Sequence, residues 1–244
     1  MAYERRGKGR PLVLIHGYPL DHTIWEPIVP LLENDFDLIL PDLRGFGASG
    51  VPRTAYLLTD IAADIAALLD SLGIEKAAIV GHSMGGYVAL AFAHAYPRRT
   101  LGLGLVSSQT LADPPERKVA RYQEAEDVLP NGVGKAAEGM SSKLTADPDL
   151  QAAMKTLILH QRPEGLAGAL RAMADRPDST PFLSEFNFPV VIVHGLADGL
   201  IPIERAREVR AGVKRGNLVE IEGAGHMPMM EAPVQTAEAL KFLK

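Results

Sequence analysis

The stretch "IVGHSMGG" (Ile79–Gly86) places one serine among glycines, directly after a short apolar run. In a sharp turn from a strand to a helix, the residues two positions before and after the apex must be small, because larger side chains would clash. Ser83 has Gly81 and Gly85 at these positions, and a helical pattern follows it as far as Pro97. The G-x-S-x-G pattern in this context predicts that Ser83 is a nucleophile. An idle serine in a glycine-rich turn is the alternative.

A serine hydroxyl is a weak nucleophile unless a base activates it, and in this arrangement the chain order is serine, acid, histidine. Four histidines follow the serine. His226 lies in "EGAGHMP", a loop just after an apolar strand, where sites form in parallel sheets. His94 falls within the helix after Ser83, His160 in a helical segment, and His194 inside the strand "VVIVHG". The sequence therefore predicts His226 as the base.

The acid is expected after the strand that precedes the base. Asp198 follows "VVIVHG" and can hold the second ring nitrogen of His226. A turn or helix-start aspartate is the alternative reading, and Asp113 is the next carboxylate to consider. Asp42 in "LILPDLRG" precedes the serine, so we expect it to order the following loop through backbone hydrogen bonds instead.

An oxyanion hole needs two backbone N–H groups that converge on one oxygen. The position directly after the nucleophile predicts Met84 as one donor, and the loop "HGYPLD" after an early strand predicts Tyr18 as the other. We expect His16 to be a buried structural residue. Trp25 is expected to anchor the core, with a substrate contact as the alternative.

Short apolar runs alternate with helical patterns along most of the chain. Near-continuous apolar strands are typical of a parallel sheet that is covered on both faces. The alternation predicts a doubly wound α/β fold. The predicted strands are residues 11–17, 36–42, 76–82, 101–108, 189–195 and 218–223.

Residues 109–185 interrupt the alternation, because they contain four helical patterns and no convincing strand. A crossover between two strands needs far fewer residues. We therefore expect a helical cap at 109–185, inserted into a core made of residues 1–108 and 186–244. An elongated crossover is the alternative.

Composition excludes several classes of function. The chain has 244 residues, 47% of them hydrophobic, and a formal net charge of −5, which gives no electrostatic case for nucleic-acid binding. The basic cluster "ERRGKGR" near the N-terminus is expected to be a solvated end. The sequence has no cysteine and no metal-ligand spacing among its seven histidines, so we expect neither a metal nor a cofactor. Without a signal peptide or an apolar span, the sequence predicts a cytoplasmic protein.

The motifs "HGYP", "PDLRGFGASG", "GHSMGG", "GLADGLIP" and "GAGHMPMMEAP" occur in order, and with them the chain resembles the α/β-hydrolase superfamily. It looks most like the small carboxylesterases, aryl esterases and cofactor-free perhydrolases. The resemblance implies Ser83 as nucleophile, Asp198 as acid and His226 as base, with oxyanion donors at Tyr18 and Met84. Family members usually open with two antiparallel strands before the "HG" strand. Only "MAYERRGKG" is available for them here, so we expect the first family strand to be missing.

The leading hypothesis is a serine hydrolase that cleaves carboxylic esters through an acyl-enzyme. An enol-lactonase, a carbon–carbon bond hydrolase or a perhydrolase would share the triad, and a ligand receptor on the same fold is the alternative from another class. We expect an apolar pocket for small to medium, mainly uncharged acyl groups, with Met140 and Met227 as candidate lining residues. An inward-pointing Arg121 or Arg171 would argue against that pocket. The physiological substrate and the oligomeric state stay open.

Overall fold

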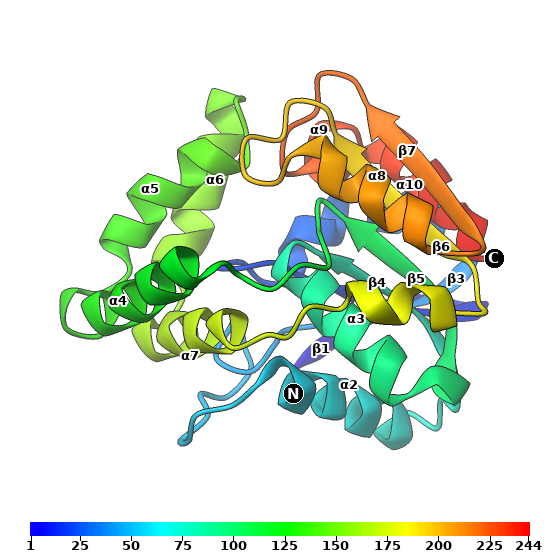
Figure 1. Cartoon of the computed structure of the whole chain (residues 1–244), viewed down its shortest axis with the longest axis horizontal. Coiled ribbons are helices and arrows are strands. Elements are labelled where there is room, and N and C mark those ends of the chain that lie inside the picture. The colour runs from blue at the N-terminus through cyan, green and yellow to red at the C-terminus, as the bar shows by residue number, and fades with distance from the viewer.

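The computed structural model describes all 244 residues and contains a seven-stranded sheet with the strand order β1-β3-β2-β4-β5-β6-β7 (Figure 1). The strands are β1 (Tyr3–Gly7), β2 (Arg10–Ile15), β3 (Phe36–Pro41), β4 (Ala77–His82), β5 (Thr100–Val106), β6 (Val190–Gly195) and β7 (Gly216–Ile221). Every neighbouring pair is parallel except β1 with β3. The predicted doubly wound, mostly parallel α/β fold is confirmed.

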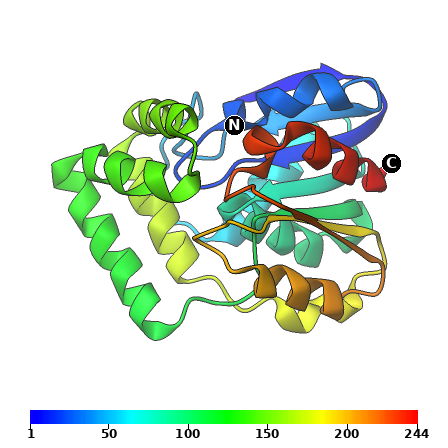
Figure 2. The same cartoon turned by 90° about the horizontal axis from the view of Figure 1, so that it is seen from above.

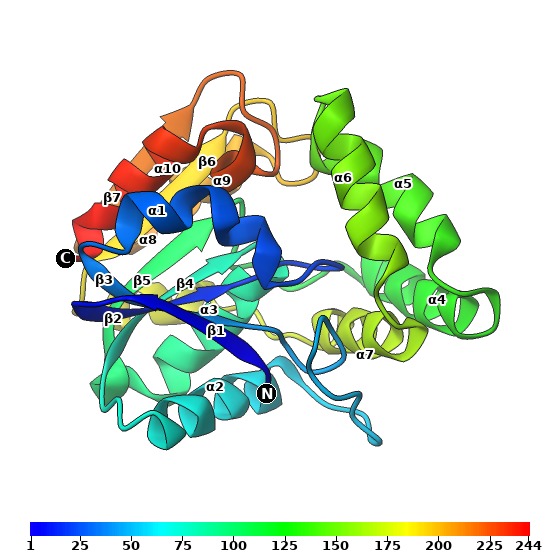
Figure 3. The ribbon, with the colours of Figure 1, turned by 180° about the vertical axis from the view of Figure 1, so that it is seen from behind.

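The sheet is buried on both faces, which explains why its central strands are apolar at nearly every position. Successive side chains point to opposite faces, so Leu12 and Leu14 belong to one core cluster and Val13 and Ile15 to the other. One face is covered by η1 (His22–Ile28), α1 (Val29–Leu32) and α10 (Pro233–Leu240), and α1 and α10 lie on the near side in Figure 3. The other face is covered by α2 (Leu58–Ser71), α3 (Met84–Ala95) and α8 (Ile203–Gly212).

Helix boundaries follow local signals in the sequence. The helix α6 (Pro148–Leu159) begins after Asp147, whose side chain accepts hydrogen bonds from the backbone N–H groups of Asp149 and Leu150. Helix α8 begins after Pro202, and α3 ends two residues before Pro97. None of the helices combines the length and the apolar character that a membrane span requires.

Most side chains of the N-terminal basic cluster are exposed, as predicted, but the segment is also part of the sheet, which was not predicted. Residues 3–7 form β1, which pairs antiparallel with β3 from Tyr3 opposite Pro41 to Gly7 opposite Asp37. Arg5 also forms a two-point ion pair with Asp37, at 2.8 and 2.7 Å. An edge strand with mostly exposed side chains carries no apolar alternation, so its backbone pairing is not visible in the sequence. One strand therefore precedes β2.

Residues 109–185 contain α4 (Pro115–Asn131), α5 (Gly134–Leu144), α6, α7 (Pro163–Ala174) and η3 (Thr180–Glu185), and no strand. Figures 1 and 2 show α4 to α7 gathered to one side of the sheet. These helices touch the loops that follow two strands, β3 and β7. The carbonyl of Leu144 accepts from the N–H of His226, Arg162 donates to the carbonyl of Ser49, and a Cβ on Gly45 would lie 2.6 Å from Gly165. The helices therefore lie over the carboxyl edge of the sheet.

Candidate active site

Ser83 lies at the turn between β4 and α3, with φ 50° and ψ −115°. A residue with a side chain rarely adopts a positive φ, so this turn holds backbone strain. The glycines of the motif are required by close contacts. A Cβ on Gly81 would lie 2.0 Å from the carbonyl oxygen of Gly85, and a Cβ on Gly85 would lie 2.3 Å from the carbonyl oxygen of Ile15. The predicted strand-turn-helix context of the serine is present.

The turn is held from the neighbouring strand by contacts that sequence reasoning missed. The N–H of Ser83 donates to the carbonyl of Val106 at 2.9 Å, and the hydroxyl of Ser108 donates to the carbonyl of Ser83 at 2.8 Å. A Cβ on Gly86 would lie 2.2 Å from the Ser108 Oγ, so this position also needs glycine. A pair of serines directly after the strand "LGLGLV" was the only signal in the sequence.

The structure brings His226 and Asp198 together from loops after β7 and β6. The Nδ1 of His226 lies 2.8 Å from Oδ2 of Asp198, and the side chains are 2% and 0% exposed. The other carboxylate oxygen accepts the N–H groups of Leu200 and Ile201 at 2.8 and 3.0 Å. Every oxygen of this carboxylate therefore has a donor that fixes its direction.

The surroundings of Asp198 keep its carboxyl group ionised. Burial alone would raise the pKa of Asp198, but the hydrogen bond and charge of His226 and the two backbone N–H groups outweigh it and lower the pKa. A carboxylate can only accept, so the His226 Nδ1 must carry a proton. The Nε2 of a neutral His226 is then free to accept one.

The loop of His226 is fixed on both sides of the histidine. One carboxylate oxygen of Glu231 accepts the N–H of Gly225 at 2.9 Å and the N–H of Met227 at 3.0 Å. The other oxygen accepts from the hydroxyl of Thr145, at the end of α5. The sequence motif "GAGHMPMMEAP" contains this glutamate, but nothing in its spacing assigned it a contact.

The two predicted oxyanion donors lie on segments that meet. Helix α3 begins with Met84, so its N–H has no acceptor within the helix. The backbone N–H of Tyr18 makes no hydrogen bond within the protein. The close approach of Gly85 to the carbonyl groups of Ile15 and His16 brings the start of α3 against the strand that leads to Tyr18.

The remaining predicted residues are found in several environments. Trp25 and His16 are completely buried, as predicted, and the two ring nitrogens of His16 contact the carbonyl of Gly17 and the N–H of Leu43. His194 is buried in β6 but also lies 3.4 Å from Asp198. His94 and His160 are exposed.

The two candidate pocket residues differ in exposure. Met227 is completely buried in the core beside the His226 loop, and Met140 on α5 is partly buried. A separate cavity of about 120 Å³ lies between α3, the start of α2 and residues 172–182, and is lined by Tyr87, Leu90, His94, Arg176 and Phe182 among others. Neither methionine and none of the three predicted catalytic residues lines this cavity.

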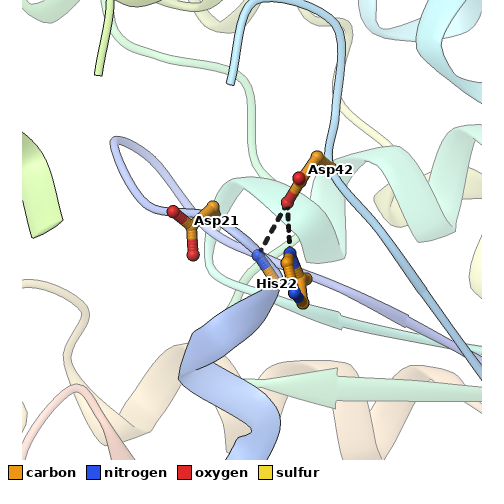
Figure 4. A group of neighbouring side chains, drawn as sticks. All are labelled: Asp21, His22 and Asp42. Atoms are coloured by element: carbon orange, nitrogen blue, oxygen red, sulfur yellow. Dashed lines mark hydrogen bonds and ion pairs between the residues drawn. The ribbon is translucent and has the colours of Figure 1, made fainter. Parts of the chain in front are cut away.

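Figure 4 shows a cluster of Asp21, His22 and Asp42, whose ligand atoms lie within 4.8 Å of one another. These atoms are already engaged. One oxygen of Asp42 accepts the backbone N–H and the Nδ1 of His22, at 3.1 and 2.6 Å, and the other accepts the N–H of Ala48 at 2.9 Å. The carboxylate of Asp21 accepts from Thr23 and Gln161. The predicted role of Asp42 in ordering the following loop is confirmed.

Comparison with known proteins gives one family. Residues 10–233 match the family model described as alpha/beta hydrolase fold. The chain is 32% identical over 243 residues to a pimeloyl-[acyl-carrier protein] methyl ester esterase of Edwardsiella ictaluri, covering 95% of this chain and 92% of the relative.

Solved structures agree with the family match. A thermophilic esterase from Thermogutta terrifontis, solved with malate bound, is 38% identical, with a TM-score of 0.95 over 98% of this chain and 91% of that chain. An enol-lactonase from Burkholderia xenovorans is 24% identical, with a TM-score of 0.91 over 99% of this chain and 95% of that chain. At 24% identity, the similarity to the enol-lactonase shows only that the two chains share a fold.

Proposed function

Because the chain belongs to the α/β-hydrolase fold family, as a member of esterase type, we propose that it is a serine hydrolase of carboxylic esters with small to medium, mainly uncharged acyl groups. The observation that carries the proposal is the buried pair of His226 and Asp198, 2.8 Å apart, beside the strained turn of Ser83. The similarity to two esterases supports the ester as the substrate class.

In the proposed mechanism, Ser83 is the nucleophile and His226 is the general base. The Oγ attacks the ester carbonyl while Nε2 of His226 takes its proton, and Asp198 stabilises the resulting imidazolium. The N–H groups of Tyr18 and Met84 stabilise the oxyanion. The imidazolium then protonates the leaving alcohol. Water then attacks the acyl-enzyme while Nε2 of His226 takes its proton. The imidazolium returns this proton to Oγ of Ser83 as the carboxylic acid leaves.

The preference for uncharged acyl groups is supported by the pairing of the helical segment's arginines. Arg121 is bound to Asp113, and Arg171 lies 2.6 Å from Glu126. Both oxygens of Asp113 are engaged, because Arg176 also lies 2.8 Å from it. The pair of Arg171 with Glu126 is neutral, and Asp113 balances one of the two charges of Arg121 and Arg176, so less positive charge is available to a carboxylate on the substrate.

The proposal is tested with p-nitrophenyl esters of increasing acyl length, acetate to decanoate, hydrolysed by wild type and by Ser83→Ala. We expect hydrolysis by wild type, a maximum at short to medium chains and almost no turnover by the variant. A parallel assay of peracid formation from hydrogen peroxide separates an esterase from a perhydrolase. Equal hydrolysis by the two proteins would contradict the assignment of Ser83.

A further inference from the structure

His82 ends β4 and directly precedes Ser83 in the chain. Its ring is completely buried, and its Nε2 lies 2.8 Å from the backbone carbonyl oxygen of His226. A carbonyl only accepts hydrogen bonds, so Nε2 of His82 must carry the proton and donate it. The two imidazole rings also meet edge to face, with centroids 4.9 Å apart. The residue before the proposed nucleophile therefore binds the backbone of the proposed base.

His194 makes a parallel contact in β6. Its ring is completely buried, and its Nε2 lies 2.8 Å from the carbonyl oxygen of Ile201 and 3.4 Å from Oδ2 of Asp198. The N–H of Ile201 donates to the other oxygen of the same carboxylate at 3.0 Å. The ring of His194 therefore closes the turn that carries the proposed acid.

The second nitrogen of each ring, Nδ1, is buried and has no partner in the protein. In His82 this nitrogen packs against the backbone, since a Cβ on Gly17 would lie 2.5 Å from it. A buried acceptor without a donor lowers stability, and an apolar side chain of similar shape would avoid that loss. At both positions, histidine differs from an apolar side chain because its Nε2 donates a hydrogen bond to a backbone carbonyl.

Both rings are neutral in the folded protein. Burial lowers the pKa of His82 to about 3, and burial also lowers the pKa of His194. A protonated ring would place a second, unpartnered N–H donor in the interior. The neutral form with the proton on Nε2 satisfies the carbonyl that each ring faces.

We infer that His82 and His194 are positioning residues, each a buried neutral imidazole that fixes one loop of the proposed triad. His82 fixes the backbone of His226, the proposed base, relative to the turn of Ser83. His194 fixes the turn that carries Asp198, the proposed acid. The inference rests on the proposed function, because it assigns both rings to the same hydrolytic site. Neither ring takes part in proton transfer, and each acts through the residue whose loop it holds.

The test compares leucine and glutamine at each position. Leucine removes the donor, whereas the amide nitrogen of glutamine reaches about as far from the backbone as Nε2 and keeps it. His160→Leu is the matched control, because it loses a histidine-to-carbonyl hydrogen bond, to Thr156, at an exposed site. Active sites are counted by titration with a serine-reactive fluorophosphonate, so that kcat refers to competent sites only. Circular dichroism confirms folding.

We expect kcat per titrated site to fall about ten- to hundredfold in His82→Leu and His194→Leu, because small displacements of catalytic groups are costly, with little change in KM. The glutamine variants should recover most of this loss, and His160→Leu should match wild type. If only the titrated fraction or the melting temperature falls while kcat per site stays at the wild-type value, both rings merely fill space and the inference is wrong. If a leucine variant does not fold, asparagine replaces it, because its amide is too short to reach the carbonyl.

A second readout is independent of ester turnover. The Nδ1 proton of His226, held by Asp198, is followed by proton NMR of protein labelled with ¹⁵N-histidine. We expect its resonance in wild type and the glutamine variants, and its loss by exchange in the leucine variants. If wild type hydrolyses no ester while this resonance still depends on His82, the proposed function fails and the positioning role stands. An unchanged resonance in both leucine variants overturns the positioning role.

Discussion

A Cβ atom on Gly81 would lie 2.0 Å from the carbonyl oxygen of Gly85, so the two outer glycines of the serine turn are in direct contact. We expect Gly81→Ala to lower the free energy of unfolding by about 2–3 kcal/mol, because the turn must open to admit a methyl group. The turn of Ser83 would move with it, so the proposed ester hydrolysis should slow as well. Urea denaturation and an ester assay check both effects.

Gly199→Ala is the control for this prediction. A Cβ at Gly199, in the loop of Asp198, meets nothing within 4 Å. Its effect on the free energy of unfolding should stay within about 0.5 kcal/mol. If Gly81→Ala is equally mild, the close contact between the glycines does not determine the turn.

Ser83 gives a prediction in which two variants lose activity alike but differ in stability. Ser83→Ala and Ser83→Gly should each lower kcat/KM by about 10⁴-fold or more, since both remove the proposed nucleophile. Only glycine relieves the strain of a φ of 50°, so Ser83→Gly should be more stable than Ser83→Ala by about 1 kcal/mol. Thermal unfolding of the two variants measures the difference. Equal stability would mean that the turn carries no strain.

The sequence predicts the fold well where burial determines the pattern. The central strands are buried on both faces, so their apolar runs mark them, and Pro202 marks the start of α8. The strand β1 was missed because its side chains are mostly exposed and its stability comes from backbone pairing with β3. Backbone hydrogen bonds leave no residue pattern at an edge.

The candidate site was predictable only where a motif specifies geometry. Glycine spacing predicts Ser83 as a site residue, and the loops at strand ends predict Asp198 and His226. The supporting contacts of Glu231 and His82 join residues 6 and 144 positions apart, from a side chain to a backbone group. Such contacts depend on how loops fold back, and no spacing rule in one sequence encodes them.

Asp198→Asn tests the orientation of His226, the proposed base. An asparagine can offer its amide N–H to Nδ1 of His226 and so favour the wrong tautomer. We expect kcat to fall about 10⁴-fold. Asp113→Asn is the control, because it removes the carboxylate that binds Arg121 and Arg176, and its folded fraction should retain turnover. Kinetics at pH 8 measure both. Full activity in Asp198→Asn would move the search for the acid to another carboxylate.

The pair of His22 and Asp42 predicts a dependence of stability on pH at both ends. The hydrogen bond to Asp42 raises the pKa of His22, so its contribution is complete below the unfolded value of about 6.5 and is lost as pH rises through the folded pKa. Burial would raise the pKa of Asp42, but bonds from His22 and Ala48 lower it overall. Its contribution is present above about pH 4 and is lost as pH falls through the folded pKa.

Urea denaturation between pH 3 and pH 9 measures this effect. Relative to wild type, His22→Gln should lose less stability between pH 6 and pH 8, and Asp42→Asn should lose less between pH 5 and pH 3. The exposed His160 provides the control, and His160→Gln should keep the wild-type profile. Parallel curves for all four proteins would show that the pair does not link folding to protonation.

The last prediction concerns the charge of the acyl group. An apolar pocket cannot replace the hydration of a carboxylate, so a charged acyl group pays for its own desolvation. We expect wild type to prefer the p-nitrophenyl ester of monomethyl succinate over mono-p-nitrophenyl succinate by about tenfold or more in kcat/KM. These two substrates have nearly the same length and differ in charge. Met140→Ala should broaden the tolerance for acyl length without changing the preference between them.

The pairing of Arg121 would explain the opposite result, a preference for the charged ester. Asp113 lies between Arg121 and Arg176, so two guanidinium groups share one carboxylate, and one positive charge in this buried trio is not compensated within it. If that charge reached the acyl group, the succinate half-ester would be the better substrate, and Arg121→Gln would reverse the order. Arg171→Gln is the control, because Arg171 pairs with Glu126 on the exposed side of α7 and α4. A preference for the charged ester that depends on Arg121 but not on Arg171 would replace the apolar pocket with an anion-binding one, and the enzyme would then act on dicarboxylate half-esters or lactones.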